Sequence, residues 1–370
     1  MHGDLALLAS NQYSKAKRLD PAVCGSGLFM EAIEQNPVYY ELAFEMPCHP
    51  DSIDLRAWLK QYATRRYGAF SPATQKAWML LLEGPYRQGT NGTEKSSIVA
   101  ARPALDVKKS GPNAGLEIPY DPALIIRAQS LLLEDADKLS ASRPYRFDLV
   151  DVQRQMMTNL GQLIHRKAAE AFRSKDREAF TLHSERFLGM LADMDTLLRT
   201  RSEYSFDRWL TEARSWGETE EEKNQMERDA TSLVTIWGAD GDPRIFDYSW
   251  REWAGLINGY YLPRWQKFYT MLQQHLDEGT SYEEAGLPQI YGREAFRAND
   301  FYHALAEWEL SYVDTYGKAR IPATEGDEID VVKRLFKKYF KLSQEYYTDS
   351  IKLIKPSRDE RTYENLGEDL

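Results

Sequence analysis

The residue best placed to do chemistry is Glu31, which follows a short apolar stretch interrupted by glycines. Residues 22–29 predict one buried strand, and Asn36-Pro37 predicts the start of a helix a few residues later. In a β/α barrel, catalytic side chains lie just past the carboxyl ends of the strands. Glu31 is therefore a candidate carboxylate nucleophile or general base. The alternative is a structural acidic residue near a helix N-terminus, where the helix dipole favours negative charge.

A second candidate is the loop of residues 237–248, which has an aromatic residue at each end, Trp237 and Tyr248. Flat rings in a loop are suited to stacking against the apolar face of a sugar, and equally suited to closing the end of a helical bundle. Further aromatic residues follow at spacings typical of a helix core, and we interpret most of them as packing residues: Trp250, Trp253, Tyr260, Tyr261 and Trp265.

Other chemistry has weak support. The six histidines are scattered, and the nearest approach to a metal motif is Asp300 with His303, one helical turn apart. A carboxylate-bridged di-metal bundle needs a second such pair, which the sequence lacks. There is no phosphate-binding loop, dinucleotide fingerprint or serine nucleophile elbow. We therefore expect neither a metal nor a cofactor.

From about residue 51 onward the pattern is helical almost throughout. Ser71-Pro72 and Asp121-Pro122 both combine a capping residue with a proline in the first turn, which predicts helix starts. Residues 84–120 carry many glycines and prolines and predict a long loop, a kind of segment that is usually functional or mobile. Long amphipathic runs lie at residues 146–173, 176–200, 205–216, 219–236, 246–277, 292–315 and 327–349.

The predicted fold is mainly α, an antiparallel helical array preceded by the last strand–loop–helix unit of an incomplete β/α barrel. An isolated strand cannot satisfy its backbone hydrogen bonds, so the chain is expected to begin inside a domain. We expect residues 1–50 to be the C-terminal remnant of a barrel, residues 51–355 to form an all-helical domain, and residues 356–370 to be a polar tail.

Composition excludes several classes of protein. The 370 residues include 47 Lys and Arg against 57 Asp and Glu, a net charge of −10, which disfavours a nucleic-acid-binding protein. No run approaches the 18 apolar residues of a membrane span, and the first residues do not predict a signal peptide. The basic amphipathic segment 331–341 fits a membrane-surface helix, or an outer helix with a solvated face, which the acidic net charge favours.

Three groups of residues together resemble one family, the α-N-acetylglucosaminidases of glycoside hydrolase family 89. Residues 25–36 are similar to its Gly-x-Gly-x-x-x-Glu-x-Ile-x-Gln-Asn stretch at the last barrel strand. Residues 62–68 are similar to its Ala-x-Arg-Arg-Tyr-Gly helix end. Residues 247–265, with Asp-Tyr, Trp-Ala-Gly-Leu and Tyr-Tyr-x-Pro-Arg-Trp in that order, resemble the strongest motif of its helical C-terminal domain.

The resemblance implies a retaining exo-glycosidase that releases terminal α-linked N-acetylglucosamine from glycans, in the lysosome, the periplasm or outside the cell. It places the family's catalytic nucleophile on Glu31 and its substrate-contacting residues on Trp237, Ile245 and Tyr248. The loop before Tyr248 is slightly longer than the family form, which makes Ile245 the weakest of these matches.

The main departure is that the family's acid/base glutamate belongs to an earlier barrel strand that this sequence lacks. Retaining hydrolysis needs two carboxyl groups about 5–5.5 Å apart. The isolated chain is therefore expected to be inactive and to need the missing barrel segment as a partner. The alternatives are a helical glycan-binding module without catalysis, or a vestigial fragment whose exposed barrel surface drives self-association.

Overall fold

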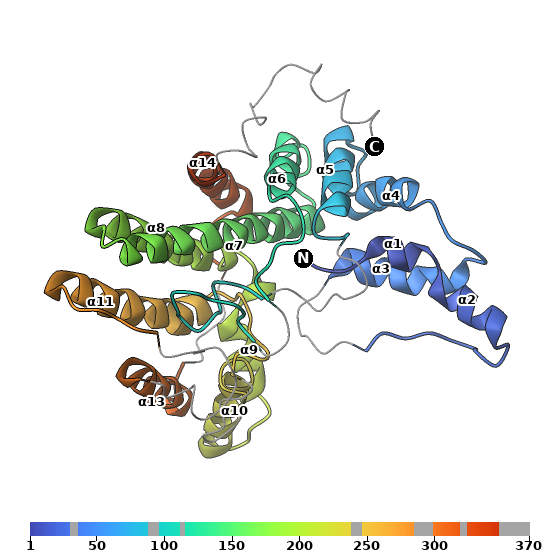
Figure 1. Ribbon diagram of the computed structural model, residues 1–370. Helices are drawn as coiled ribbons and strands as arrows, with labels where there is room; N and C mark the ends of the chain where they lie inside the picture. Colours follow the sequence, from blue (N-terminus) through green and yellow to red (C-terminus); the bar gives the residue numbers. More distant parts are fainter. Residues whose placement is uncertain are drawn as a thin grey trace.

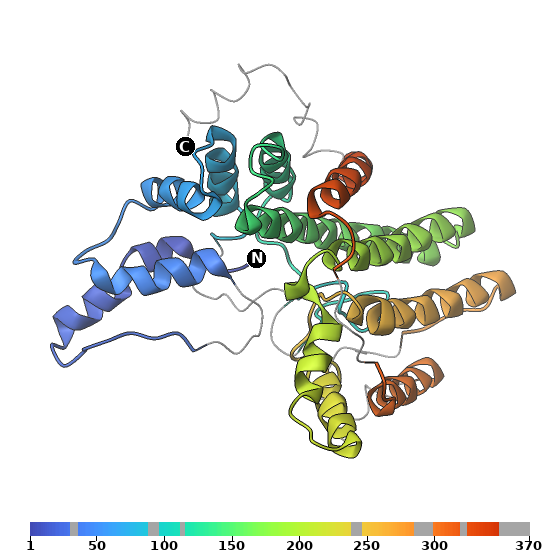
Figure 2. The same cartoon turned by 180° about the vertical axis from the view of Figure 1, so that it is seen from behind.

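The fold is built from helices packed on one another, as Figures 1 and 2 show from opposite sides. The computed structural model describes residues 1–29, 36–87, 96–111, 115–237, 246–284, 299–318 and 324–347. Within these ranges there is no β-strand, only two isolated bridges between single residues, Asp4 with Arg87 and Ser205 with Ala254. The prediction of a mainly helical fold is confirmed.

The described α-helices are α1 (Leu5–Ala9), α2 (Gln12–Leu19), α3 (Pro37–Glu45), α4 (Leu55–Tyr67), α5 (Pro72–Glu83), α6 (Ala123–Glu134), α7 (Arg143–Arg173), α8 (Arg177–Leu198), α9 (Phe206–Arg214), α10 (Glu220–Leu233), α11 (Leu262–Glu278), α13 (Asp300–Asp314) and α14 (Glu328–Tyr346). Short 3₁₀ turns span Met46–Cys48 and Ser202–Tyr204, and a π-helical turn spans Ile257–Tyr261.

Helix starts follow the expected capping chemistry. The Ser71 hydroxyl accepts the backbone N–H of Thr74, and Pro72 occupies the first turn of α5. At the start of α10, Thr219 and Glu222 form a reciprocal capping box. These side chains satisfy backbone donors that the first helical turn leaves unpaired, so the predicted starts are confirmed at these points.

The hairpin of α7 and α8 runs through the middle of the molecule, with α6 and α14 on one side and α11 on the other (Figure 1). Gly161 of α7 lets its neighbours come close. A Cβ there would lie 2.6 Å from Met190 Cε and 3.2 Å from Ile98 Cγ2. The hairpin is thus the rigid frame on which the remaining elements pack.

Residues 96–111 lack regular structure, yet residues 96–105 are all buried. Ile98, Val99 and Ala100 are buried, and the carbonyl groups of Val99 and Ala100 accept hydrogen bonds from Trp265 (3.3 Å) and Arg264 (2.6 Å) of α11. A buried loop is tolerated only where its backbone polar groups find partners. This part of the predicted long loop is therefore a structural wedge between α7 and α11.

Helix α14 is an outer helix with a solvated face, which is the second interpretation of its basic residues. Val332 and Leu335 are buried against the helical core. Lys333 pairs with Asp137 (3.1 Å) and Lys338 with Asp193 (2.6 Å). Among the described helices, none is long and apolar enough to cross a bilayer.

Two predictions about local structure are wrong. Residues 22–29 form no strand: Cys24 is exposed and the side chain of Phe29 is 97% exposed. A strand needs a neighbour to pair with, and the described residues offer none. The helix expected over 246–277 begins only at the π-helical turn, because Asp247 and Gly255 adopt left-handed backbone angles that interrupt it. Helices α1 and α2 were not predicted.

Buried His165 of α7 generates a prediction about pH. Its ring lies 4.8 Å from the Trp265 ring, and its Nδ1 is 2.9 Å from the Tyr269 hydroxyl. Burial lowers the pKa of His165 to about 4, from an ordinary value near 6.5. The unfolded chain therefore binds the proton more tightly, and the stability present above pH 6.5 is lost as pH falls towards 4.

We expect the free energy of unfolding to fall by about 2 kcal/mol between pH 8 and pH 5 through His165 alone. Urea denaturation of the wild type and of His165→Phe at both pH values measures this as the difference between the two pH dependences. Parallel pH dependences in the two proteins would refute this assignment.

Candidate functional site

Trp237 and Tyr248, which frame the loop singled out in the sequence, lie together in the structure. Their ring centroids are 4.7 Å apart with the ring planes at 50°. Both residues are half-buried. Glu31 and Ile245 lie outside the described residues. The role of all four residues in binding or catalysis stays a prediction.

The backbone beneath the aromatic pair adopts an unusual conformation. Trp237 has φ of 59° and Asp247 has φ of 55°, in the left-handed region that residues other than glycine seldom occupy. The two turns are tied together, because the Asp247 N–H donates to the Thr235 carbonyl (2.7 Å). Such conformations persist only where the surrounding structure enforces them, and they cluster at functional sites.

The turns that carry Trp237 and Tyr248 also pack against helix α13 through apolar side chains. Ile236 precedes Trp237 and Phe246 precedes Asp247, and both side chains are buried in a small cluster with Ala306 and Val313. This cluster is separate from the main core. The two aromatic rings therefore sit above a dedicated patch of packing that fixes the turns carrying them.

Ion pairs also hold the turn that contains Asp247, and they centre on Arg264 of α11. This side chain is fully buried, and its Nη1 lies 2.9 Å from Asp247 Oδ2 and 3.1 Å from Glu309 Oε1. Its guanidinium also lies over the ring of Tyr260, 4.5 Å from the centroid. Arg102 pairs with the other side of Glu309, with Nη2 3.0 Å from Oε2. Four buried side chains thus contact one another in the order Arg102, Glu309, Arg264 and Asp247, and we call this set the ion chain.

Asp247 is the member of this chain whose charge is hardest to maintain. Burial raises the pKa of Asp247 to about 7, against the lowering effect of Arg264, and the nearby charge of Glu309 raises it further. Asp247 Oδ1 is buried with no hydrogen-bond partner among the described residues. A raised pKa means that this group stabilises the fold most at low pH, and that this contribution is lost as pH rises through 7.

These ionic residues were not recognised as functional in the sequence. Asp247 and Arg264 both lie in the motif that carries the family resemblance, yet nothing in the sequence pairs them with Glu309 or Arg102, which lie far away along the chain. One signal was present: an arginine within a run of aromatic residues is unusual in a helix that is otherwise apolar on its buried side. Such an arginine requires a buried acidic partner.

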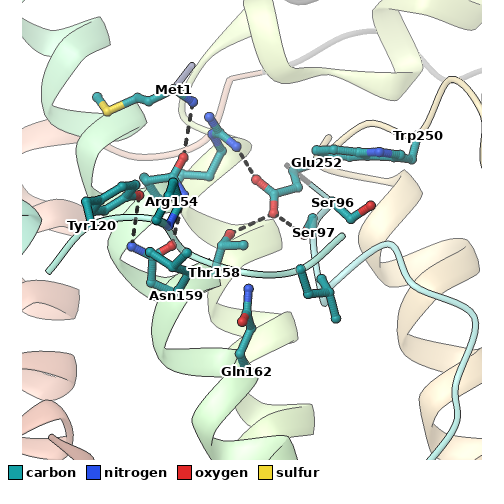
Figure 3. Close-up of a pocket in the computed structure, with 14 residues that line it drawn as sticks. Met1, Ser96, Ser97, Tyr120, Arg154, Thr158, Asn159, Gln162, Trp250 and Glu252 are labelled. Carbon is teal, nitrogen blue, oxygen red and sulfur yellow. Dashed lines mark hydrogen bonds and ion pairs between the residues drawn. The ribbon is translucent and has the colours of Figure 1, made fainter. Parts of the chain in front are cut away.

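A second polar cluster surrounds Glu252 and lines a small cavity (Figure 3). The Glu252 carboxylate is fully buried and accepts hydrogen bonds from Ser97 Oγ (2.5 Å) and Thr158 Oγ1 (2.7 Å), and it pairs with Arg154. The cavity of about 30 Å³ has room for one or two water molecules. Through its hydrogen bonds and its ion pair, Glu252 joins the segment 96–111 to α7.

Asp300 and His303, the nearest approach to a metal motif in the sequence, belong to no metal-binding group among the described residues. His303 of α13 lies 3.6 Å from Glu307 Oε1, and both side chains are largely exposed. Across the described part of the chain, no group of three His, Cys, Asp or Glu residues is placed to hold a metal ion.

Comparison with known proteins gives consistent matches. The family described as the α-N-acetylglucosaminidase C-terminal domain matches residues 58–338. Human α-N-acetylglucosaminidase is 32% identical over 344 residues, which cover 90% of this chain and 43% of the human protein. The chain therefore spans less than half the length of this relative.

Solved structures of a family 89 glycoside hydrolase from Clostridium perfringens are also similar. Its complex with 2-acetamido-1,2-dideoxynojirmycin superposes with a TM-score of 0.79 at 26% identity, covering 94% of this chain and 38% of that one. A variant with two glutamates replaced by glutamine, in complex with its substrate GlcNAc-α-1,4-galactose, has the same TM-score and identity. That match covers 91% of this chain and 37% of the other.

The buried ion chain generates a stability prediction. Arg264→Gln leaves Asp247 and Glu309 facing each other without their shared cation, and removal of one partner of a buried pair typically costs about 3–5 kcal/mol. Urea denaturation is expected to show a loss of this size.

The matched control is Arg208→Gln, because Arg208 forms an exposed pair with Glu212 (2.7 Å) on α9. Exposed pairs contribute about 0–1 kcal/mol, so this variant should unfold close to the wild type. Equal losses in the two variants would contradict the importance given to Arg264.

Proposed function

Because the chain belongs to the α-N-acetylglucosaminidase family, glycoside hydrolase family 89, we propose that it supplies one wall of a site for terminal α-linked N-acetylglucosamine. The observation that carries this proposal is the half-buried pair of Trp237 and Tyr248. Their rings lie on turns in a strained backbone conformation, clamped by a buried ion chain. A fold that needed only to close a helix end would not require this support.

The aromatic pair suits a sugar because C–H groups on the flat face of a pyranose ring pack against aromatic faces. In the proposed site, Trp237 and Tyr248 provide these faces, and Ile245 adds an apolar contact. Such contacts orient the sugar without carrying out any bond cleavage. The C. perfringens enzyme, captured with GlcNAc-α-1,4-galactose as its substrate, supports N-acetylglucosamine as the sugar held here.

Catalysis in the proposed scheme needs two carboxyl groups. Glu31 attacks the anomeric carbon and forms the glycosyl-enzyme intermediate, while a second glutamate protonates the leaving oxygen and then activates water. We place the second group in the part of the human relative that this chain does not span, since the match covers 43% of that protein. The C. perfringens substrate complex, with two glutamates replaced, supports the need for two such groups.

The proposal therefore divides the chain into a barrel end at residues 1–50, a helical domain at 51–355 and a tail at 356–370. Large apolar side chains exposed on or beside the first three helices support a barrel partner that covers this region. Leu19 is 88% exposed, Phe29 97% and Phe44 60%. Left uncovered, the same side chains favour self-association.

A non-catalytic glycan-binding module is the second candidate. Its support is that the aromatic pair and its ionic clamp are complete within residues 96–309 and need no contribution from Glu31. The two candidates share the sugar and differ in whether cleavage follows when the barrel is supplied.

Binding is tested by titrating the chain with GlcNAc-α-1,4-galactose in a calorimeter. We expect weak binding, with Trp237→Ala and Tyr248→Ala each reducing the affinity by about 5–10-fold, the loss of about 1–1.5 kcal/mol typical of an aromatic contact. Trp216→Ala is the matched control, since the Trp216 side chain is 83% exposed at the turn before α10. Equal affinity of Trp237→Ala and wild type would exclude the proposed site.

Hydrolysis is tested with an aryl α-N-acetylglucosaminide. The chain alone is expected to release no detectable phenol, because the proposed scheme assigns only Glu31 of the pair to this chain. Co-expression with the upstream barrel of a relative is expected to give turnover that Glu31→Gln abolishes. Turnover by the chain alone would contradict the two-part scheme, and silence of the mixture would favour the binding module.

A further inference from the structure

We propose that Asp247 is a positioning residue that couples the geometry of the Trp237–Tyr248 pair to the protonation of one buried carboxyl group. The consequence for sugar binding rests on the proposed function, whereas the coupling itself rests only on the geometry of the described residues.

The connection between Asp247 and both rings is short. Tyr248 follows it directly in the chain, and the Asp247 N–H donates to Thr235, two residues before Trp237. The backbone beneath is tightly confined, because a Cβ on Gly111 would lie only 2.9 Å from the Asp247 carbonyl oxygen. A change in how the Asp247 side chain is held is therefore transmitted to both turns.

The two carboxylates of the ion chain are held unequally. Glu309 receives contacts from both arginines, Arg102 and Arg264, through both of its oxygens. Asp247 receives one, from Arg264 Nη1 to Oδ2, while its Oδ1 has no partner among the described residues. When one proton binds to the ion chain, we therefore expect it to bind to Asp247, at Oδ1, the oxygen without a partner among the described residues.

The groups that face Asp247 come from four elements. Arg264 of α11 lies in contact, Glu309 of α13 lies beyond it, and Arg102 of the buried segment acts through Glu309. Tyr260 and Tyr261 of the π-helical turn pack against the Arg264 guanidinium at 4.5 and 5.1 Å. Burial raises the pKa of both tyrosines well above 10, so neither titrates near neutrality.

Protonation weakens the clamp without removing it. The ionised carboxylate forms a charge-assisted bond to Arg264, and the neutral carboxyl retains only an ordinary hydrogen bond, which is roughly half as strong. With the pKa of Asp247 raised to about 7, the charge-assisted bond to Arg264 forms above this pH and the weaker bond replaces it below, even though the protonated carboxyl has the smaller cost of burial. The Trp237 ring is therefore expected to have one average environment at pH 8.5 and another at pH 5.5.

The test is ¹⁹F NMR of the chain labelled with 5-fluorotryptophan. The sequence has nine tryptophans, and Trp237→Phe identifies the resonance of Trp237. We expect this resonance to titrate between pH 5 and 9 with a midpoint near 7 in the wild type, and to become independent of pH in Asp247→Asn. A wild-type resonance that stays constant over this range overturns the proposal, as does a titration that survives in Asp247→Asn.

The matched control is Asp148→Asn. Asp148 is also a buried aspartate held by an arginine, with Arg66 Nε 2.7 Å from Oδ2, but it joins α4 to α7. We expect its removal to leave the Trp237 titration unchanged. Loss of the titration in Asp148→Asn would show that the effect follows from general loosening and would overturn the specific role of Asp247.

A second variant keeps the test decisive where Asp247→Asn does not fold. Arg102→Gln removes a positive charge that lowers the pKa of Asp247, so the midpoint is expected to move to higher pH. An unchanged or lowered midpoint overturns the proposal. A titration that behaves as expected in a chain that binds no GlcNAc-α-1,4-galactose would retain this coupling and refute only the proposed function.

Discussion

The structure depends on one buried interaction, the guanidinium of Arg264 placed between two carboxylates. Through it, α11 is joined to α13 by Glu309, to the irregular segment 96–111 by the Ala100 carbonyl, and to the aromatic turns by Asp247. The Nη1 and Nη2 atoms of Arg264 have these partners, whereas its Nε is buried without a hydrogen-bond partner among the described residues. The elements that meet here come from four separate parts of the chain, so this interaction helps to fix their relative positions.

The packed helices and the candidate site differ in backbone conformation. The α7–α8 hairpin and α11 provide close-packed, regular elements, with Gly161 allowing the closest approach. The residues proposed to meet a ligand lie instead on turns with left-handed backbone angles, where a side chain can be presented in a direction that a helix does not permit. The packed helices provide a rigid support, and the strained turns hold the side chains that are proposed to contact a ligand. Binding residues on loops that a rigid core positions are a common arrangement.

Much of the fold follows from the sequence. Amphipathic periodicity and capping residues such as Ser71 located most of the long helices, because these signals are local. The failures are equally physical. Residues 22–29 have the composition of a strand, but a strand exists only with a paired neighbour. The break at Asp247 was missed because tertiary contacts enforce its backbone angle. The Arg264–Glu309 pairing spans 45 residues, and no periodicity encodes it.

In the proposed site, the face of N-acetylglucosamine lies against the Trp237–Tyr248 pair. Saturation-transfer difference NMR of GlcNAc-α-1,4-galactose with the chain tests this most directly, because it reports which ligand protons touch the protein. The strongest saturation is predicted on the ring protons of N-acetylglucosamine, with weak transfer to galactose and a marked decrease in Trp237→Ala. Stronger transfer to galactose, or a pattern unchanged in Trp237→Ala, would contradict the claim.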